Sequence, residues 1–238
     1  MYSNNHDYVF GNLIHDPTKN FISADVRSEF FKAAIRFIDY ELIEGDIFEF
    51  GVYSGRSLAL LSYFHELSKR SIHKINFTRN IVGFDSFEGL PETDGHPRWK
   101  KNLFNVNHSS HPLSKLGDKI TDQTVYELFK LFSLQSPILQ IGTFDKTVTH
   151  DNMAKFNKAA LIHIDCDIYQ STKTVLDGIV NHLQEGTLLL FDDWFHFKGN
   201  KDKGEQKAFF EFMATSQWDF IEYQTYATFG KSFITTYK

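Results

Sequence analysis

Two pairs of aspartates stand where apolar segments of this chain end. Asp192 and Asp193 directly follow an apolar run that closes with Phe191, while Asp165 and Asp167 follow a second such run. Adjacent carboxylates at the end of a buried strand repel each other, which costs free energy unless a cation or several donors compensate them. If the two runs are neighbouring parallel strands, their carboxyl ends meet in the crevice where open α/β sheets bind ligands. The spacing therefore predicts a metal site.

Each acidic pair also has a structural alternative. Asp192 and Asp193 could cap the following helix, because Asp is favoured at N-cap positions. Asp167 could instead accept hydrogen bonds from the backbone of a helix that begins near Ser171. Two acidic clusters at successive strand ends favour the metal site over separate caps.

A glycine-containing loop between a predicted strand and a predicted helix is the second chemical signal. Residues 49–57 contain Gly51 and Gly55, which allow a tight turn and a close approach to a ligand, and the helix start offers free N–H groups. The pattern GxxxG lacks the middle glycine of the dinucleotide fingerprint. Asp85 ends the next predicted strand, where an acidic side chain can accept hydrogen bonds from ribose hydroxyls. Together these features indicate an adenosine-containing ligand.

Glu49 narrows the choice of that ligand. Its carboxylate beside the glycine loop would repel a pyrophosphate, but it is compatible with a ligand that carries an ammonium and a sulfonium. S-adenosylmethionine fits this description. An NAD(P)-dependent oxidoreductase on the same loop is one alternative, disfavoured by the missing glycine and by Glu49. A non-catalytic protein that keeps the cofactor fold is another, and the intact carboxylates argue against it.

The elements that must position these residues alternate between strand and helix. The predicted strands are residues 47–50, 81–84, 138–141, 160–164, 187–191, 218–223 and 232–237. The predicted helices are residues 23–43, 57–67, 124–134, 171–183 and 206–214. Such alternation predicts an α/β fold with a mostly parallel sheet covered on both faces, closed by an antiparallel pair formed by the last two strands.

Length and composition predict a single domain. The 238 residues, with 42% hydrophobic and 16% aromatic side chains, suffice for one sizeable core. Residues 1–44 read as an N-terminal helical extension. Residues 94–136, rich in Pro, Gly and polar side chains, read as a lid or insertion, since long connections in compact domains are usually functional.

Charge and cysteine content exclude several classes of partner. A net charge of -5 and the lack of any long basic run argue against nucleic acid. The polar first residues lack the features of a signal peptide, and no apolar run approaches the roughly 18 residues of a membrane span. The single cysteine, Cys166, excludes an internal disulfide. We therefore expect a soluble cytoplasmic protein with no membrane partner.

Five segments, in this order along the chain, resemble the macrocin O-methyltransferase family. They are residues 49–57, 83–91, 142–147, 164–172 and 191–194. The resemblance covers roughly residues 45–215, and its most specific part is the acidic block that begins at Asp165, followed by the later aspartate pair. Members of this family methylate sugar hydroxyls of macrolide and aminocoumarin antibiotics.

The resemblance implies a class I methyltransferase (Rossmann-like) fold with a seven-stranded sheet, S-adenosylmethionine as methyl donor, and a divalent metal, usually Mg²⁺. It makes Asp165, Asp192 and Asp193 the expected metal ligands and Asp167 the expected general base. The residues expected at the cofactor are Glu49, Gly51, Tyr53, Ser54, Ser57, Asp85, Ser86, Gly142, Thr143 and Asp165. The implied partner is a small carbohydrate or glycoside with a vicinal diol, and a homo-oligomer is compatible with the aromatic N-terminal helix.

The chemistry of the residues agrees with this assignment. Mg²⁺ prefers oxygen ligands at roughly 2.1 Å in an octahedron, so three carboxylates leave positions for two sugar hydroxyls. A metal-bound hydroxyl loses its proton more readily, and a nearby carboxylate can remove it. Methyl transfer from a sulfonium then requires chiefly alignment of oxygen, carbon and sulfur and exclusion of water.

Overall fold

The structure, a computed structural model, describes residues 22–23, 25–72, 75, 77–91, 95–105 and 120–238. Residues 1–21 and 24 of the N-terminal extension predicted over residues 1–44 lie outside these ranges. Residues 94 and 106–119 of the lid predicted over 94–136 also lie outside them. Among the described residues, no helix combines the length and the apolar character that crossing a membrane would require.

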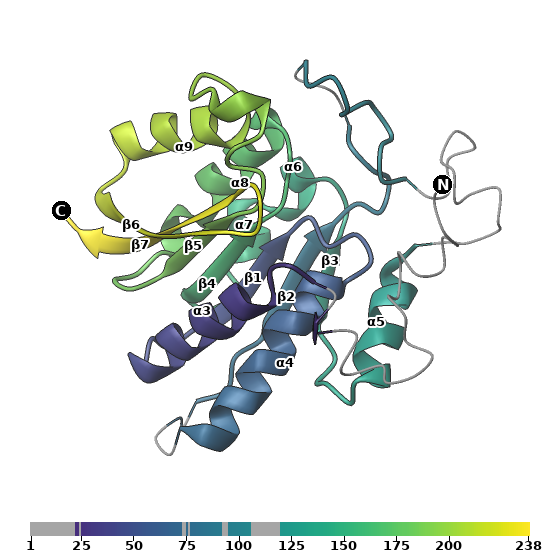
Figure 1. The fold of residues 1–238 in the computed structure, drawn as a ribbon, viewed down its shortest axis with the longest axis vertical. Coiled ribbons are helices and arrows are strands. Elements are labelled where there is room, and N and C mark those ends of the chain that lie inside the picture. Colours follow the sequence, from purple (N-terminus) through teal and green to yellow (C-terminus); the bar gives the residue numbers. More distant parts are fainter. Residues whose placement is uncertain (1–21, 24, 73–74, 76, 92–94, 106–119) are drawn as a thin grey trace.

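The described chain forms a seven-stranded sheet in the order β3-β2-β1-β4-β5-β7-β6 (Figure 1). The strands are β1 Asp46–Phe50, β2 Ile81–Asp85, β3 Ile138–Ile141, β4 Ala159–Ile164, β5 Leu188–Phe191, β6 Trp218–Tyr226 and β7 Gly230–Tyr237. The first five strands pair in parallel, whereas β7 is antiparallel to both β5 and β6. The predicted mostly parallel sheet with a closing antiparallel pair is confirmed.

Helices cover both faces of the sheet. They are α3 Ser28–Tyr40, α4 Arg56–Ser71, α5 Asp122–Leu131, α6 Phe144–Thr147, α7 His150–Met153, α8 Tyr169–Ile179 and α9 Gly204–Thr215, with short 3₁₀ turns η2 Val180–His182 and η3 Phe197–Gly199. The helix predicted over residues 23–43 is shorter than expected and begins at Ser28. Its predicted start fails because the Asp25 carboxylate accepts a hydrogen bond from the backbone N–H of Arg27, a local contact that competes with helix formation.

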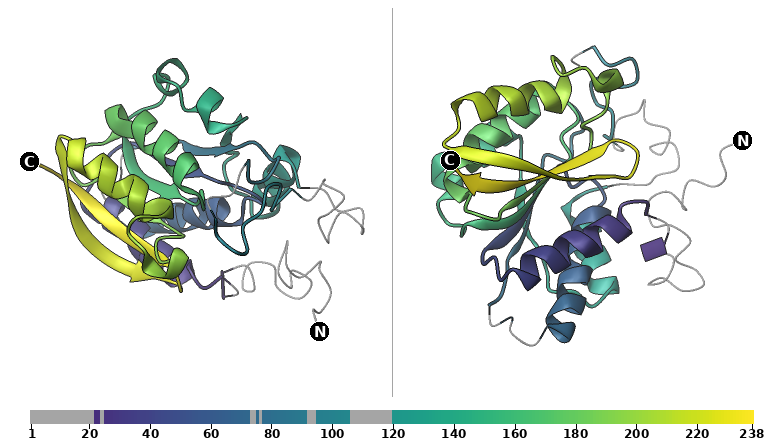
Figure 2. Two further views of the ribbon diagram at one scale, coloured as in Figure 1. Left: turned by 90° about the horizontal axis from the view of Figure 1, so that it is seen from above. Right: turned by 60° about the vertical axis from the view of Figure 1, so that its left-hand side comes forward.

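Alternate residues of each strand enter opposite layers. Ile47 belongs to the core cluster that contains residues of α3, α4 and α5, while its neighbour Phe48 belongs to the cluster that contains residues of α8 and α9. Leu161 and Leu190 likewise belong to the α3 side, so the residues two positions further along β4 and β5 also face α3. Figure 2 shows the β6–β7 hairpin at the edge of the sheet between the α3 and α9 layers. The carboxyl ends of β4 and β5 therefore present side chains beneath the start of α3.

A buried ionic network fixes α3 in this position. Asp39 of α3 is fully buried and accepts hydrogen bonds from the Arg79 guanidinium, with Nη2 at 3.0 Å from Oδ1. The Nδ1 atom of His65, on α4, lies 3.1 Å from the other carboxylate oxygen. Because charges withdrawn from water need close partners, the contacts of Asp39 hold α3 to α4 and to the segment before β2.

We expect Asp39→Asn to lower the free energy of unfolding by about 3 kcal/mol, since it leaves the Arg79 charge buried without its counter-ion. Urea unfolding followed by circular dichroism measures this loss. Asp151→Asn is the matched control, because Asp151 is fully exposed on α7 and its removal should change little. Equal stability of the Asp39→Asn protein and the wild type would contradict the role given to the network.

Candidate active site

A cavity of about 740 Å³ lies at the carboxyl ends of the parallel strands. Its wall is built from the loops that follow β1, β2, β3 and β4, as expected for an open α/β sheet. The described residues that line it include most of those expected at a cofactor, with Glu49 as the exception. The lining members of that set are Gly51, Tyr53, Ser54, Ser57, Asp85, Ser86, Gly142, Thr143 and Asp165. Their individual roles toward a ligand stay predictions.

The loop after β1 is held tightly against the loop after β4. Gly51 has φ 92°, and a Cβ atom at this position would lie 1.8 Å from the carbonyl oxygen of Asp165. Only glycine satisfies both constraints. Gly51 therefore serves the contact between two loops of the wall, which is a structural requirement that holds with or without a ligand.

Asp85 ties the loop after β2 to the loop after β1. Its Oδ2 atom accepts hydrogen bonds from the backbone N–H groups of Val52 and Tyr53, both at 2.7 Å, and its Oδ1 atom accepts one from Phe87 at 2.7 Å. A carboxylate that accepts several backbone hydrogen bonds is firmly fixed. Asp85 thus shapes the cavity, and the ribose contact expected of it stays a prediction.

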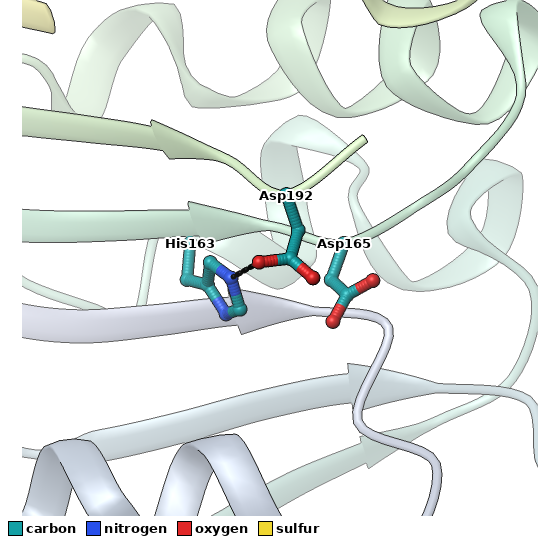
Figure 3. Close-up of side chains that lie close together, drawn as sticks. All are labelled: His163, Asp165 and Asp192. Carbon is teal, nitrogen blue, oxygen red and sulfur yellow. Dashed lines mark ion pairs between the residues drawn. The ribbon is translucent and has the colours of Figure 1, made fainter. Parts of the chain in front are cut away.

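Three side chains that can hold a metal ion come together at the ends of β4 and β5. One ligand atom each from His163, Asp165 and Asp192 lies within 4.8 Å of the other two (Figure 3). The pairing of Ile164 with Phe191 brings the two aspartates to neighbouring strand ends. The sequence predicted this meeting of Asp165 and Asp192 but missed His163. The sequence did contain a signal for His163, because it stands two residues before Asp165 and residues two apart on a strand share a face.

Glu49 reaches this cluster through His163. The two residues are direct partners in the β1–β4 register, and Nδ1 of the imidazole lies 2.8 Å from Oε1 of the carboxylate. Glu49 is fully buried beneath α3, so the direct cofactor contact expected of it stays a prediction. Nε2 of His163 lies 3.5 Å from Oδ1 of Asp192. The imidazole therefore stands between two carboxylates.

The two carboxylates determine the charge of His163. Burial alone would lower the pKa of the imidazole, but its contacts with the Asp192 and Glu49 carboxylates raise that pKa to about 10. In the absence of a bound metal, His163 is an imidazolium at neutral pH. Burial would also raise the pKa of Asp192, but the adjacent Arg27 and His163 hold it well below its usual range.

Asp193 and Glu205 extend the acidic cluster on the far side of β5. The backbone N–H of Asp193 donates to Oε2 of Glu205 at 3.0 Å, and its own Oδ1 lies 3.2 Å from Nε2 of His196. Oδ2 of Asp193 and Oε1 of Glu205 are buried and accept no hydrogen bond from any residue that the structure describes. Burial and then the neighbouring carboxylates raise the pKa of Glu205 and Asp165 well above their usual ranges.

These unpaired buried oxygens fit a cation site, since a buried carboxylate without donors is costly unless a cation compensates it. Asp193 lies beside the group of His163, Asp165 and Asp192 rather than within it, and its role as a metal ligand stays a prediction. Sequence reasoning missed Glu205. It stands in the first turn of α9, where an acidic residue is ordinary.

The guanidinium of Arg27 compensates part of this negative charge. Its Nη1 atom lies 3.2 Å from Oδ2 of Asp165 and 3.2 Å from Oδ2 of Asp192. The sequence gave no signal for this residue, because Arg27 is remote in the chain from both aspartates. It precedes α3 directly and reaches the cluster because α3 lies over the ends of β4 and β5.

Asp167 has an unusual backbone conformation at the cavity wall. It has φ 62°, in the left-handed region, and its side chain lies in the lining of the cavity. The backbone N–H of Ile168 donates to the carbonyl of Cys166 at 2.7 Å, which closes the tight turn around Asp167. A left-handed non-glycine residue is costly and is often found at functional sites. Its role as a general base stays a prediction.

An aromatic contact joins two loops beside the site. Trp99 is buried and packs on His196 and Phe197, with ring centroids at 4.8 Å and 5.2 Å. Tyr53 and Phe104, both in the cavity lining, meet edge to face at 5.6 Å. The segment 95–105 therefore packs against the loop after β5 at one end and against the glycine loop at the other.

Comparison with known proteins identifies relatives of this fold. The model of the family described as macrocin-O-methyltransferase (TylF) matches residues 21–210. The chain is similar to the O-methyltransferase NovP, with 19% identity, a TM-score of 0.63 and coverage of 88% of this chain and 79% of that one. It is also similar to the calicheamicin methyltransferase CalS11, with 21% identity, a TM-score of 0.58 and coverage of 98% and 86%.

A putative O-methyltransferase from Klebsiella pneumoniae is similar at 16% identity, with a TM-score of 0.59 and coverage of 100% of this chain and 92% of that one. No sequence among the curated proteins matches the chain. At such identities the solved structures establish a shared fold, which is the class I methyltransferase fold expected from the sequence.

The charge of His163 predicts a pH dependence of stability in the metal-free protein. Its folded pKa of about 10 exceeds the ordinary value of 6.5, so its contribution is fully present below pH 6.5 and is lost as the pH rises toward 10. We expect the free energy of unfolding to fall over this interval, and to fall less in Glu49→Gln, where the imidazolium loses one partner. Urea unfolding in the presence of a chelator measures both slopes, and equal slopes would contradict this assignment.

Proposed function

The chain belongs to the macrocin O-methyltransferase (TylF) family and is an S-adenosylmethionine-dependent O-methyltransferase, and we propose that it methylates a hydroxyl of a sugar or related vicinal diol with the help of a divalent cation. The observation that carries this proposal is the meeting of Asp165, which lines the cavity, with Asp192 at the ends of β4 and β5, beside buried oxygens that no described residue hydrogen-bonds. The oxidoreductase considered from the sequence is set aside by the family membership.

The cavity lining supports an assignment of the cofactor to the loops after β1, β2 and β3. In this proposal the glycine loop and the start of α4 hold the amino acid part, and the Asp85 loop holds the nucleoside. The bound cofactor supplies a methyl group on an already activated sulfonium. The enclosing walls, including Tyr53 and Phe104, would exclude water and align the acceptor oxygen with that methyl group.

The acidic cluster supports binding of a divalent cation by Asp165, Asp192 and Asp193. Carboxylate oxygens are ligands that Mg²⁺ and other hard divalent cations prefer. A metal bound here would lower the pKa of a hydroxyl group coordinated to it. His163 is a further candidate ligand, since a metal-binding imidazole commonly donates its other N–H to a carboxylate, as its contact with Glu49 would allow. Asp167, at the cavity wall, would accept the proton that the acceptor hydroxyl releases.

A solved relative supports a carbohydrate as the acceptor. CalS11, in its apo structure, is described as a TDP-rhamnose 3'-O-methyltransferase of calicheamicin biosynthesis, at 19% identity and a TM-score of 0.55. By analogy we propose a sugar, free or linked to a nucleotide, as the acceptor class of this chain. Two adjacent hydroxyls would occupy metal positions that the carboxylates leave free.

Transfer of labelled methyl groups from S-adenosylmethionine to a panel of acceptors tests the proposed function. The panel contains nucleoside-diphosphate sugars, simple glycosides and a catechol, each with Mg²⁺ and with a chelator. We expect transfer to a sugar that the chelator abolishes. Transfer to the catechol and to no sugar would refute the acceptor class, whereas transfer that survives the chelator would refute the role of the metal.

The variants Asp165→Asn and Asp192→Asn should each reduce metal-dependent turnover by about a hundredfold or more, because each removes a charged ligand. Cofactor affinity, measured by calorimetric titration, should be nearly unchanged, since the Asp85 loop holds the nucleoside. Asp202→Asn is the matched control, because Asp202 is exposed in the loop that precedes α9. Loss of cofactor binding in either site variant would contradict this division of roles.

The Asp167→Asn variant should reduce turnover by about a hundredfold, the usual contribution of a general base. Its affinity for Mg²⁺ should stay close to that of the wild type, because the proposed ligands are intact. Single-turnover transfer and Mg²⁺ titration measure the two quantities separately. Unchanged turnover would remove Asp167 from the proposed reaction.

A further inference from the structure

A side chain of this chain already acts as a cation between the two proposed metal ligands. Nη1 of Arg27 is equidistant, at 3.2 Å, from Oδ2 of Asp165 and Oδ2 of Asp192. The three side chains are 16%, 27% and 20% exposed, respectively, so their charges are largely withdrawn from water. Charge-assisted hydrogen bonds in such surroundings are stronger than those at the surface.

The rest of the guanidinium is anchored independently of these two aspartates. Nε and Nη2 of Arg27 donate to the two oxygens of Asp25, each at 3.1 Å, and Arg56 donates to Asp25 as well, at 3.1 Å. The guanidinium also lies 5.4 Å from the ring centroid of Phe31. The guanidinium is planar and rigid, so its bonds to Asp25 also fix the position of Nη1. The Nη1 contacts can therefore be broken by movement of the Asp165 and Asp192 carboxylates, with the Asp25 anchor and the Phe31 contact left in place.

We propose that Arg27 is the resident counter-cation of Asp165 and Asp192, and that a divalent cation binds these carboxylates by displacing Nη1 of Arg27. This inference rests on the metal site of the proposed function and adds a residue that sets its affinity. A metal ligated by both carboxylates would stand roughly 2.1 Å from each oxygen. Nη1 already makes contact with these same oxygens, and like charges so close together repel strongly in a site withdrawn from water.

The Arg27 guanidinium stays at the cavity wall after a metal has replaced it at the two carboxylates. Arg27 lines the cavity, and its anchor to Asp25 keeps the guanidinium at the wall after the two carboxylates turn from Nη1 to the metal. The metal-loaded form then presents a free N–H donor toward the space that the acceptor must enter. Arg27 is thus a positioning residue. It neutralises part of the negative charge of Asp165 and Asp192 before the metal binds, and it presents an N–H donor to the cavity after the metal has bound.

Calorimetric titration of the full chain with Mg²⁺ tests the exchange. We expect Arg27→Gln to bind Mg²⁺ about tenfold more tightly than the wild type, because the competing charge-assisted hydrogen bonds are gone. Arg56→Gln is the matched control, since it removes a nearby positive charge that contacts Asp25 and should change the affinity by less than about threefold. Equal or weaker Mg²⁺ binding by Arg27→Gln than by the wild type would overturn the proposal, as would an equal gain in both variants.

A second measurement uses the wild type and so does not depend on the folding of a variant. The guanidinium NMR signals of Arg27, assigned with Arg27→Lys, should show slow rotation of both Nη groups without Mg²⁺. At saturating Mg²⁺ this restriction should be lost for Nη1 and kept for Nη2, which stays bound to Asp25. Unchanged signals at saturation would overturn the exchange while leaving the metal-dependent reaction intact. Failure of methyl transfer with normal Mg²⁺ exchange would instead refute the proposed function alone.

Discussion

The repulsion among carboxylates at the ends of β4 and β5 is the constraint on which the arrangement of the site depends. Asp165, Asp192, Asp193 and Glu205 are drawn together by strand register and by the first turn of α9. Buried like charges are tolerated only with nearby cations. The chain supplies them from two directions: an imidazolium in β4 and a guanidinium ahead of α3. Each of these cations is in turn held by a further contact, to Glu49 or to Asp25.

Topology explains why these contacts are possible. In a parallel sheet, the strands end along one edge, and alternate residues point to the same layer. His163 and Asp165 therefore face the α3 side, as does Glu49 on the adjacent strand. The Asp39 network fixes α3 over this part of the sheet. The position of Arg27, at the N-terminal end of α3, thus depends on the buried ion pair of Asp39, about three helical turns further along that helix. This dependence links the stability of the fold to the electrostatics of the site.

Periodicity and local motifs were enough to predict the sheet, the closing hairpin and the meeting of Asp165 with Asp192. These features depend on residues that are close in the chain or on the shared edge of parallel strands. The start of α3 was wrong because a side chain of Asp25 competes with the helix backbone. His163 had a readable signal in its spacing from Asp165. Arg27 and Glu205 had no readable signal. Arg27 stands 138 residues before its partner Asp165, and Glu205 stands 12 residues after its partner Asp193. These contacts arise from the packing of separate elements, which no local sequence pattern encodes.

The loop contact made by Trp99 has an optical consequence. Of the three tryptophans in the chain, Trp99 packs on His196, and Trp194 directly follows the acidic pair. Trp218 pairs with Tyr237, at the end of β6 remote from the cavity. Indole emission depends on the groups that contact the ring, and therefore separation of the segment 95–105 from the loop after β5, which removes the contacts of Trp99 with His196 and Phe197, alters the emission of Trp99. The protein contains its own fluorophore for following the approach of these two loops, without an attached dye.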